Sequence, residues 1–453
     1  MSEEEDLKQL NEFEQSIKAQ TEATGESSES DFEKQLLASS QKVTTPATGN
    51  EEALDDFEKQ LTAGAAPQGN APKPGMIKVK KNLLLSFVSD STGCGHIRNV
   101  FPLTYLNSVF SKSDALHTII SPYFVTQAEM LQRAKLIFFQ RQMAPQHLAL
   151  IKQYRKNADA LKYIMAWDMD DMIWGLNENQ GGDKYSGVPS YNFGAKNITP
   201  AIKKSSVEIM NQMDVCTFST QFLADYARDV LKVKAQCMVI PNSIPKYLWG
   251  DELRPLPTKE ELKKPRVIYT GSPTHYNNQT KKLGDWKNSW KDWVIKAVKK
   301  DEIEFYCFGG LPWFFEEIKD KVIIRDWVPS YNYHQIVKKV KAHIGIMPLV
   351  RNDFNHAKSD LKYIEHCADG VPAIGSVFRK GVSPYDNNIL QMPDDCSVSD
   401  IDAMFDKLKD PDYYEEVQIQ QREMMDRDGR WTETQGYVDH WKKLFSAKIF
   451  PQN

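Results

Sequence analysis

Short hydrophobic runs alternate with amphipathic stretches along the chain after residue 80. The first half has strand-like runs at 81–89, 116–121, 135–139, 161–167, 214–219 and 237–241. Helical stretches such as 145–157 and 220–231 separate them. Regular alternation of strand and helix is typical of α/β proteins. The pattern therefore predicts a parallel sheet covered by helices.

A second series of the same kind follows a charged connector at 247–265 that is interrupted by prolines. Its expected strands are 266–270, 303–308, 322–325, 343–348 and 372–375, and 434–445 is expected to form an amphipathic terminal helix. We expect two Rossmann-like domains, at 76–250 and 260–430, facing each other across a cleft. Ligands of such sheets bind at the carboxyl ends of the strands.

The first 75 residues have a different composition. They contain 16 Asp and Glu against 6 Lys and Arg, and they lack Trp, Tyr and Cys. Such a segment buries too little apolar surface to offset the entropy of ordering, so we predict a disordered tail. Within it, Phe13, Phe32 and Phe57 each precede Leu or Ile by four residues in a repeated F-E-K-Q-L-like motif. The repeats predict either docking peptides for a protein partner or a neutral duplication.

Charge and cysteine usage narrow the class of protein. The chain carries a net charge of −4 and its first 75 residues carry −10, so residues 76–453 carry +6. This excess permits an anionic ligand without indicating nucleic-acid binding. The six cysteines form no C-x-x-C pair, and no apolar run approaches a membrane span of about 20 residues. We expect a cytoplasmic enzyme with reduced thiols.

The segment Phe354–Ser376 holds the strongest chemical pattern. We expect one helix that carries Lys358, Ser359, Lys362 and Glu365 and ends at an Asp-Gly-Val-Pro turn before an apolar strand. Spacings of i, i+4 and i+7 place the two lysines and the glutamate on one face. Ser359 would lie at the helix start, where backbone N–H groups favour an anion such as phosphate. A solvated stripe of charges is the alternative interpretation.

This segment resembles the donor-binding signature of retaining glycosyltransferases of the GT-B fold, in the family-4-like group. The resemblance covers roughly residues 80–445 and rests on Glu365 followed by Gly370 and Pro372 before a strand of small residues. It implies that Glu365 holds the ribose of a nucleotide-sugar, and that a C-terminal helix within 431–453 crosses back to the first domain. The family's usual second glutamate is replaced here by Ala357, with Lys358 beside it. The pattern is closer to a phage and bacterial variant subgroup with a K-S-x-L-K-x-x-E helix.

Other expected donor-site residues follow strands at the predicted cleft. Glycines after a strand allow backbone N–H groups to approach a phosphate. In the family's layout the loop after the first strand faces the donor. A later Gly-Ser loop contacts the donor pyrophosphate, and two nearby lysines would form a positively charged clamp for it. The donor-binding candidates in these loops are Gly93, Gly95, Gly271, Ser272, His275, Lys281 and Lys282. The resemblance also implies that the loop 326–331 brackets the nucleotide base, although core packing of Trp327 and Tyr331 is the alternative.

Catalytic candidates are His96 and the carboxylates that end the strand before residue 168. Asp168, Asp170 and Asp171 lie within four residues of one another and could bind a divalent ion, orient an acceptor or cap a helix. Because GT-B enzymes usually need no metal for catalysis, we assign none. The candidate catalytic residues are therefore His96, Asp168 and Asp171.

The resemblance implies a retaining glycosyltransferase that moves a hexosyl or pentosyl group from a nucleoside-diphosphate sugar to an acceptor hydroxyl. The donor is a substrate, and no cofactor is expected. The acceptor is either a surface or protein glycan or a hydroxymethylated base of phage DNA. A different class also stays open, namely a virion or scaffold protein with a glycosyltransferase-like fold that uses its repeated tail for assembly.

Overall fold

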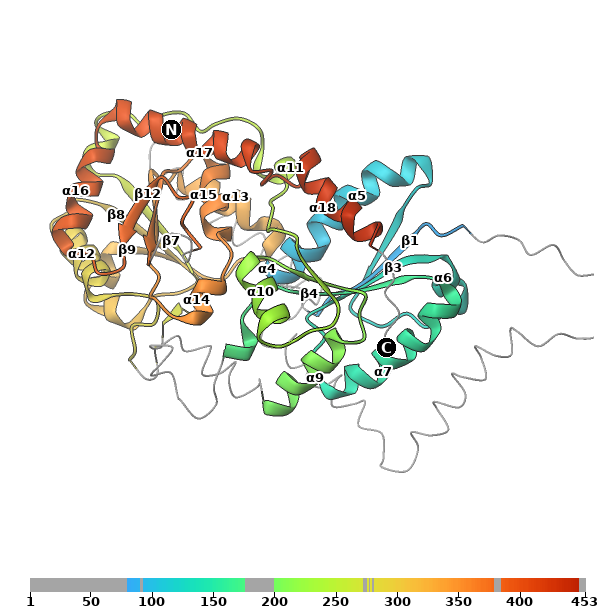
Figure 1. Ribbon diagram of the computed structural model, residues 1–453. Helices are drawn as coiled ribbons and strands as arrows, with labels where there is room; N and C mark the ends of the chain where they lie inside the picture. Colours follow the sequence, from blue (N-terminus) through green and yellow to red (C-terminus); the bar gives the residue numbers. More distant parts are fainter. Residues whose placement is uncertain are drawn as a thin grey trace, which may run out of the picture. The chain divides into compact units, whose positions relative to one another are not determined.

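The computed structural model describes residues 80–89, 93–175, 199–271, 275–276, 278, 281–378 and 384–447 (Figure 1). From Lys81 onward the described residues belong to one compact unit. The motifs around Phe13, Phe32 and Phe57 lie outside the described residues, so the docking hypothesis stays a prediction.

Two parallel six-stranded sheets form the framework of this unit, with strand orders β2-β1-β3-β4-β5-β6 and β12-β11-β10-β7-β8-β9. The first contains β1 (Leu83–Phe87), β2 (His117–Ser121), β3 (Ala134–Gln140), β4 (Ile164–Met169), β5 (Val215–Phe218) and β6 (Gln236–Val239). The second contains β7 (Arg266–Thr270), β8 (Glu304–Phe308), β9 (Val322–Arg325), β10 (Ile344–Met347), β11 (Ala373–Val377) and β12 (Leu390–Pro393).

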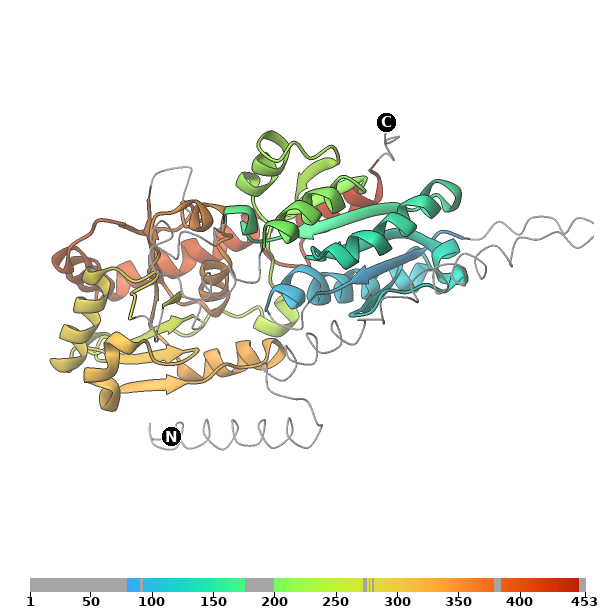
Figure 2. The same ribbon diagram turned by 90° about the horizontal axis from the view of Figure 1, so that it is seen from below.

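Helices connect these strands and cover the sheets (Figures 1 and 2). In the first half they are α4 (Gly93–Gly95), the π-helix η1 (His96–Val100), α5 (Phe101–Phe110), η2 (Ser111–Ser113), α6 (Ala128–Arg133), α7 (Pro145–Leu161), η3 (Ile173–Gly175), α9 (Pro200–Met210) and α10 (Gln221–Asp229). Then come α11 (Lys246–Trp249), η5 (Glu261–Lys263), α12 (Asn288–Lys299), η7 (Trp313–Lys321), α13 (Ser330–Val340), α14 (Asp353–Ala357), α15 (Leu361–Asp369), α16 (Val398–Leu408), α17 (Pro411–Arg427) and α18 (Gln435–Phe445).

The first sheet is buried on both faces, which explains why its strands are continuous apolar runs. In β1, Leu83, Leu85 and Phe87 belong to one core with α7, α9 and α10, whereas Leu84 faces a second core with α5 and α18. The terminal helix α18 therefore completes the first half. Its Trp441 ring lies 5.4 Å from that of Phe138 in β3, and α18 lies beside α5 in Figure 1.

The helix α14 follows a strand of the second sheet but packs into the core of the first. Phe354 and Ala357 are buried in the same cluster as Trp167 and Leu223. Burying a phenylalanine side chain contributes about 1.5–3 kcal/mol. This contact anchors the segment that leads into α15.

The predicted fold class is confirmed, because both series of strands form parallel sheets covered by helices. The sequence pattern missed β12, whose four residues alternate buried and exposed and lack a long apolar run. All six cysteines are free, and Cys216, Cys307, Cys367 and Cys396 are buried. Within the described residues, no helix combines the length and the apolarity needed to cross a bilayer.

Candidate donor site at the carboxyl end of the second sheet

The expected single helix carrying Lys358, Ser359, Lys362 and Glu365 is wrong. Helix α14 ends at Ala357, Lys358 is extended with φ −61° and ψ 150°, and α15 begins only at Leu361. Long-range hydrogen bonds explain the break. The Thr220 hydroxyl donates to the carbonyl of Ala357 over 3.0 Å, and Asn242 Nδ2 donates to Ser359 Oγ over 2.7 Å. The first bond occupies a backbone carbonyl that would accept a hydrogen bond in a continuing helix, and the second holds the Ser359 side chain in the segment between the two helices.

The lysines nevertheless stay close enough for their charges to interact. Lys362 and Glu365 lie one turn apart on α15, and both side chains are half-buried. Burial, followed by the charge of Lys358, lowers the pKa of Lys362 to about 7. Burial raises the pKa of Glu365 to about 7, against the charge of Lys362 and a 3.4 Å hydrogen bond from Tyr333 Oη. Perturbed pKa values of this kind cluster at functional sites.

Helix α15 ends where the sequence predicted, at a glycine. Gly370 has φ +68°, a left-handed conformation that residues with a Cβ rarely adopt, and it caps the helix before β11. The preceding Asp369 is buried and accepts a hydrogen bond from Arg254 Nη2 over 2.6 Å. The end of α15 is therefore fixed both locally and by the connector between the two halves.

The loop after β7 approaches α15 from the second sheet. Gly271 has no room for a side chain, because a Cβ would lie 2.3 Å from the Tyr269 hydroxyl. His275 is buried, and its Nε2 lies 3.1 Å from Lys362 Nζ. Ser272 lies outside the described residues. Of the expected residues in this loop, the structure thus joins His275 to Lys362.

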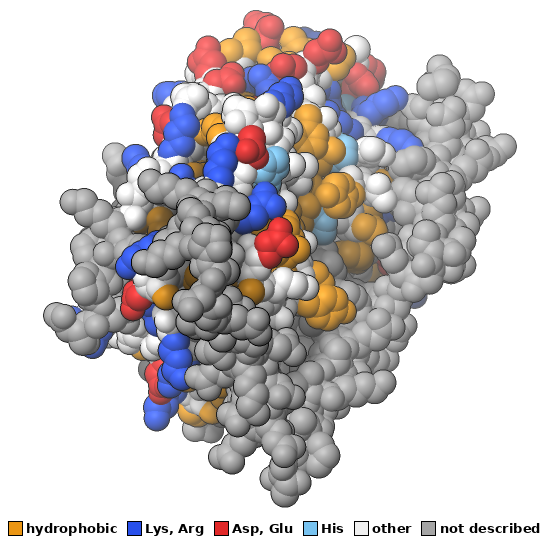
Figure 3. All heavy atoms as spheres, turned by 90° about the vertical axis from the view of Figure 1, so that its right-hand side faces the viewer, with side chains coloured by type: hydrophobic (Ala, Val, Ile, Leu, Met, Phe, Trp, Pro, Cys, Tyr) orange, Lys and Arg blue, Asp and Glu red, His pale blue; other side chains and the backbone are white. Residues whose placement is uncertain are grey.

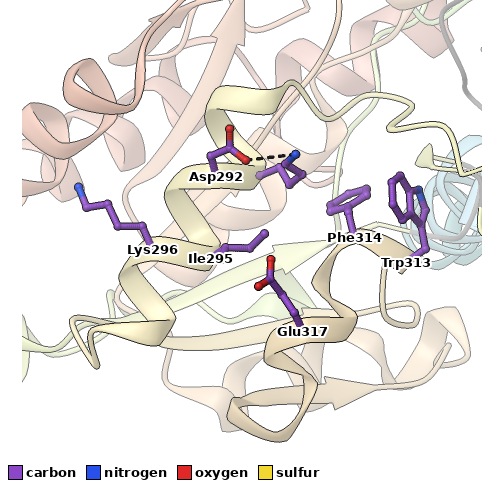
Figure 4. Close-up of a pocket in the computed structure, with 7 residues that line it drawn as sticks. Asp292, Ile295, Lys296, Trp313, Phe314 and Glu317 are labelled. Atoms are coloured by element: carbon purple, nitrogen blue, oxygen red, sulfur yellow. Dashed lines mark ion pairs between the residues drawn. The ribbon is translucent and has the colours of Figure 1, made fainter.

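The two expected clamp lysines lie next to Trp313. Lys281 Nζ lies 5.6 Å from the centroid of the Trp313 ring, and the carbonyl of Lys282 accepts a hydrogen bond from Trp313 Nε1 over 3.1 Å. Trp313 lines a separate depression of about 420 Å³ between α12 and η7 (Figure 4). Its other lining residues are Lys291, Asp292, Ile295, Lys296, Phe314 and Glu317, none of which was an expected site residue.

The glycines after β1 lead into a buried turn. Gly93 and Gly95 form α4, and a Cβ on Gly93 would meet open space. His96 is buried, with its ring 5.0 Å from that of Tyr331 in an edge-on contact. Tyr331 and Trp327 are about half exposed, so the alternative of core packing is wrong for both. The expectation that Trp327 and Tyr331 bracket the nucleotide base stays a prediction.

The three candidate carboxylates have different surroundings. Asp168 is fully buried and accepts hydrogen bonds from Arg98 over 3.0 and 2.5 Å and from Thr217 over 2.7 Å. Asp171 forms an ion pair with Arg141; burial raises its pKa, while Arg141 opposes that shift. The ligand atoms of Asp170, Asp171 and Cys94 lie within 4.8 Å of one another, a spacing that could hold a metal ion. Asp168 is thus placed to anchor Arg98.

Sequence reasoning missed two residues of this region. Asp285, in the segment before α12, is fully buried and lies 2.6 Å from His275 Nδ1. Tyr333, on α13, reaches Glu365. Both contacts join segments far apart in the chain, and no local motif marks either residue.

Comparisons with known proteins agree with this architecture. No family model and no curated protein matches the sequence. Among solved structures, the chain is similar to sucrose-phosphate synthase of Thermosynechococcus elongatus, with a TM-score of 0.53 and 12% identity over 82% of this chain and 100% of that one. The HepE protein of Anabaena, in complex with UDP and glucose, matches with a TM-score of 0.49 and 7% identity over 81% of this chain and 100% of that one.

An α-glucosyltransferase in complex with UDP and a 13-mer DNA containing a HMU base matches with a TM-score of 0.46 and 10% identity, over 81% of this chain and 100% of that one. The likeness to sucrose-phosphate synthase bears on the fold, since its TM-score exceeds 0.5. Two parallel six-stranded sheets, each covered by helices, together with this likeness define the GT-B fold.

Proposed function

We propose that this protein is a glycosyltransferase that moves a sugar from a nucleoside-diphosphate sugar to an acceptor hydroxyl. The observation that carries the proposal is the cluster of Lys358, Lys362 and Glu365 at and before α15, where two lysine side chains and one carboxyl group remain partly open to solvent. Side chains at the carboxyl end of a parallel sheet are where α/β folds bind ligands.

The roles within this site follow from charge. The lysines bind the diphosphate, which gains negative charge as the glycosidic bond breaks, so they stabilise the transition state more than the ground state. Glu365 accepts hydrogen bonds from the ribose hydroxyls. The acceptor attacks from the side that the diphosphate leaves, through an oxocarbenium-like transition state, and the configuration of the transferred sugar is retained.

The acceptor is a glycan, a protein or a hydroxymethylated DNA base. On the face shown in Figure 3, the described side chains mix basic, acidic and hydrophobic groups. Binding to a nucleic-acid backbone draws on clustered positive charge. That part of the surface therefore supports a DNA acceptor no better than a glycan. A purely structural scaffold role is not favoured, since the donor-site charges are assembled around α15.

A screen of nucleotide-sugars tests the proposal. A ligand that binds only the native state at 100 times its Kd stabilises a protein by about 2.7 kcal/mol, which raises the Tm measurably. We expect one nucleoside-diphosphate sugar to raise the Tm of the full chain and to be hydrolysed slowly to free diphosphate. If none of a panel of UDP-, GDP-, ADP- and TDP-sugars does either, the proposed function is wrong.

A further inference from the structure

A buried chain of hydrogen bonds ends on Lys362. Asp285 Oδ2 lies 2.6 Å from His275 Nδ1, and His275 Nε2 lies 3.1 Å from Lys362 Nζ. Asp285 Oδ1 also accepts a hydrogen bond from Asn355 Nδ2 over 2.7 Å. The three other members of this chain, His275, Asp285 and Asn355, are buried, whereas Lys362 itself is half-buried. The chain therefore runs from the protein interior to the edge of the proposed donor site.

The backbone holds Asp285 beside His275. The amide of Asp285 donates to the carbonyl of His275 over 2.8 Å. The intervening turn requires a glycine, because Gly284 has φ +67° and a Cβ there would lie 2.0 Å from the carbonyl oxygen of His275. The segment is thus shaped to keep the carboxylate next to the imidazole.

The protonation of each group follows from its neighbours. Burial alone would raise the pKa of Asp285, but its bonds to His275 and Asn355 and the charge of Lys358 bring that pKa below its ordinary value. Burial and the charges of Lys362 and Lys358 lower the pKa of His275 to about 3. A neutral imidazole beside an ionised carboxylate carries its proton on Nδ1. Nε2 is then left as an acceptor for an N–H of Lys362.

The surroundings of Lys362 act on its positive charge in opposite directions. Its ammonium position is 5.4 Å from the Tyr269 ring, and Lys358 repels it while Asp285 and Glu365 attract it. Burial outweighs this attraction and lowers the pKa of Lys362 to about 7. Among the described residues, titratable groups near this chain also include Tyr269 on β7, His366 on α15, Tyr333 on α13, and Tyr385. An arriving diphosphate would add negative charge next to the amine.

We propose that Asp285 acts through His275 as a positioning residue for Lys362, and that binding of a diphosphate at this site takes up one proton from solvent onto Lys362. In the empty site Lys362 donates an N–H to His275 Nε2, and in the occupied site the ammonium form also donates to the anion. This inference rests on the proposed donor site and adds a protonation step to it.

Calorimetry in two buffers measures the uptake. UDP, GDP and ADP are titrated into the full chain at pH 8, in HEPES and in Tris, whose ionisation enthalpies differ. A terminal phosphate with a pKa of about 6 is already ionised at this pH. A lysine of pKa about 7 is largely neutral. We expect the tightest-binding diphosphate to take up about 0.9 proton, since roughly nine-tenths of such a group is neutral one unit above its pKa.

Matched variants show which side chain takes up the proton and which one positions it. Lys362→Met should abolish the uptake, whereas Glu365→Gln should weaken binding and keep the uptake. Asp285→Asn removes the carboxylate that fixes the tautomer of His275, so the uptake should move to lower pH and the affinity at pH 8 should fall about tenfold. Asp301→Asn, a surface carboxylate paired with Lys264, is the control and should change neither quantity.

The outcomes distinguish the two proposals. If a diphosphate binds the wild type with no buffer-dependent enthalpy, the proposed proton uptake onto Lys362 is wrong, while the proposed donor site stands. Unchanged proton uptake in Lys362→Met would show that the proton does not go to Lys362. An Asp285→Asn variant that matches Asp301→Asn in affinity and in pH profile would overturn the positioning role of Asp285. If no diphosphate binds the folded wild type, both proposals are wrong. Lys362 is half-buried, so its variant keeps the test available if Asp285→Asn does not fold.

Discussion

Asn242 Nδ2 donates a hydrogen bond to Ser359 Oγ over 2.7 Å and so joins the end of the first half of the chain to the segment before α15. The other side of the same amide is also used, because Asn242 Oδ1 accepts from Arg98 Nη1 over 2.9 Å. Arg98 in turn binds Asp168 through two nitrogens. A continuous polar chain thus links β4 to the segment that carries Lys358.

Asn242→Ala should lower the free energy of unfolding by about 1–3 kcal/mol, because it leaves a buried guanidinium with one acceptor fewer. Urea denaturation followed by circular dichroism measures the change. Gln420→Ala, which removes an exposed amide bonded to Glu416, is the matched control. Equal losses in the two variants would contradict the structural role of this amide.

Glu365→Ala should weaken binding of the nucleotide-sugar by about 1.5–3 kcal/mol if its carboxylate accepts ribose hydroxyls. Isothermal titration with the donor found by the thermal screen gives the number. Glu316→Ala removes an exposed carboxylate paired with Lys319 and should bind as the wild type does. Wild-type affinity in a folded Glu365→Ala variant would exclude the ribose role.

Donor turnover should persist in excess EDTA, because lysine side chains rather than a metal ion are proposed to stabilise the leaving diphosphate. Release of free diphosphate with and without the chelator is the measurement. Complete loss of turnover that a divalent ion restores would instead assign Cys94, Asp170 and Asp171 as metal ligands.

Stability should fall as the pH drops below about 6.5. Burial comes first among the causes that lower the pKa of His275 and of His366 to about 3, from an unfolded value of about 6.5. Between those values the unfolded chain binds more protons, so each histidine costs about 2 kcal/mol of stability at pH 5. His334 and His343 shift in the same direction.

The slope of the unfolding free energy against pH, from urea titrations between pH 7.5 and 5, reports this proton uptake. A flat profile down to pH 5 would contradict the prediction, because it would mean that the folded and unfolded chains take up equal numbers of protons over this range.

Local pattern determined much of the fold. Continuous apolar runs marked eleven of the twelve strands, because strands buried on both faces need hydrophobic residues at successive positions. Gly370 marked the end of α15, since a left-handed cap favours glycine. The apolar stripe of Tyr437, Trp441 and Leu444 marked α18 in the same way. Each of these signals lies within a few residues of the feature that it predicts.

The site depended on contacts that sequence spacing does not contain. Charge periodicity predicted one helix through Lys358 and Lys362, but the helix ends at Ala357, whose carbonyl accepts a hydrogen bond from Thr220, and Asn242 binds the side chain of Ser359 in the break. Asp285 reaches Lys362 only through His275, from another segment. The sequence by itself therefore determined the strands, the cap and the residue types of the proposed donor site. Only the tertiary structure decided their orientation and protonation, because hydrogen bonds and burial between distant segments set both.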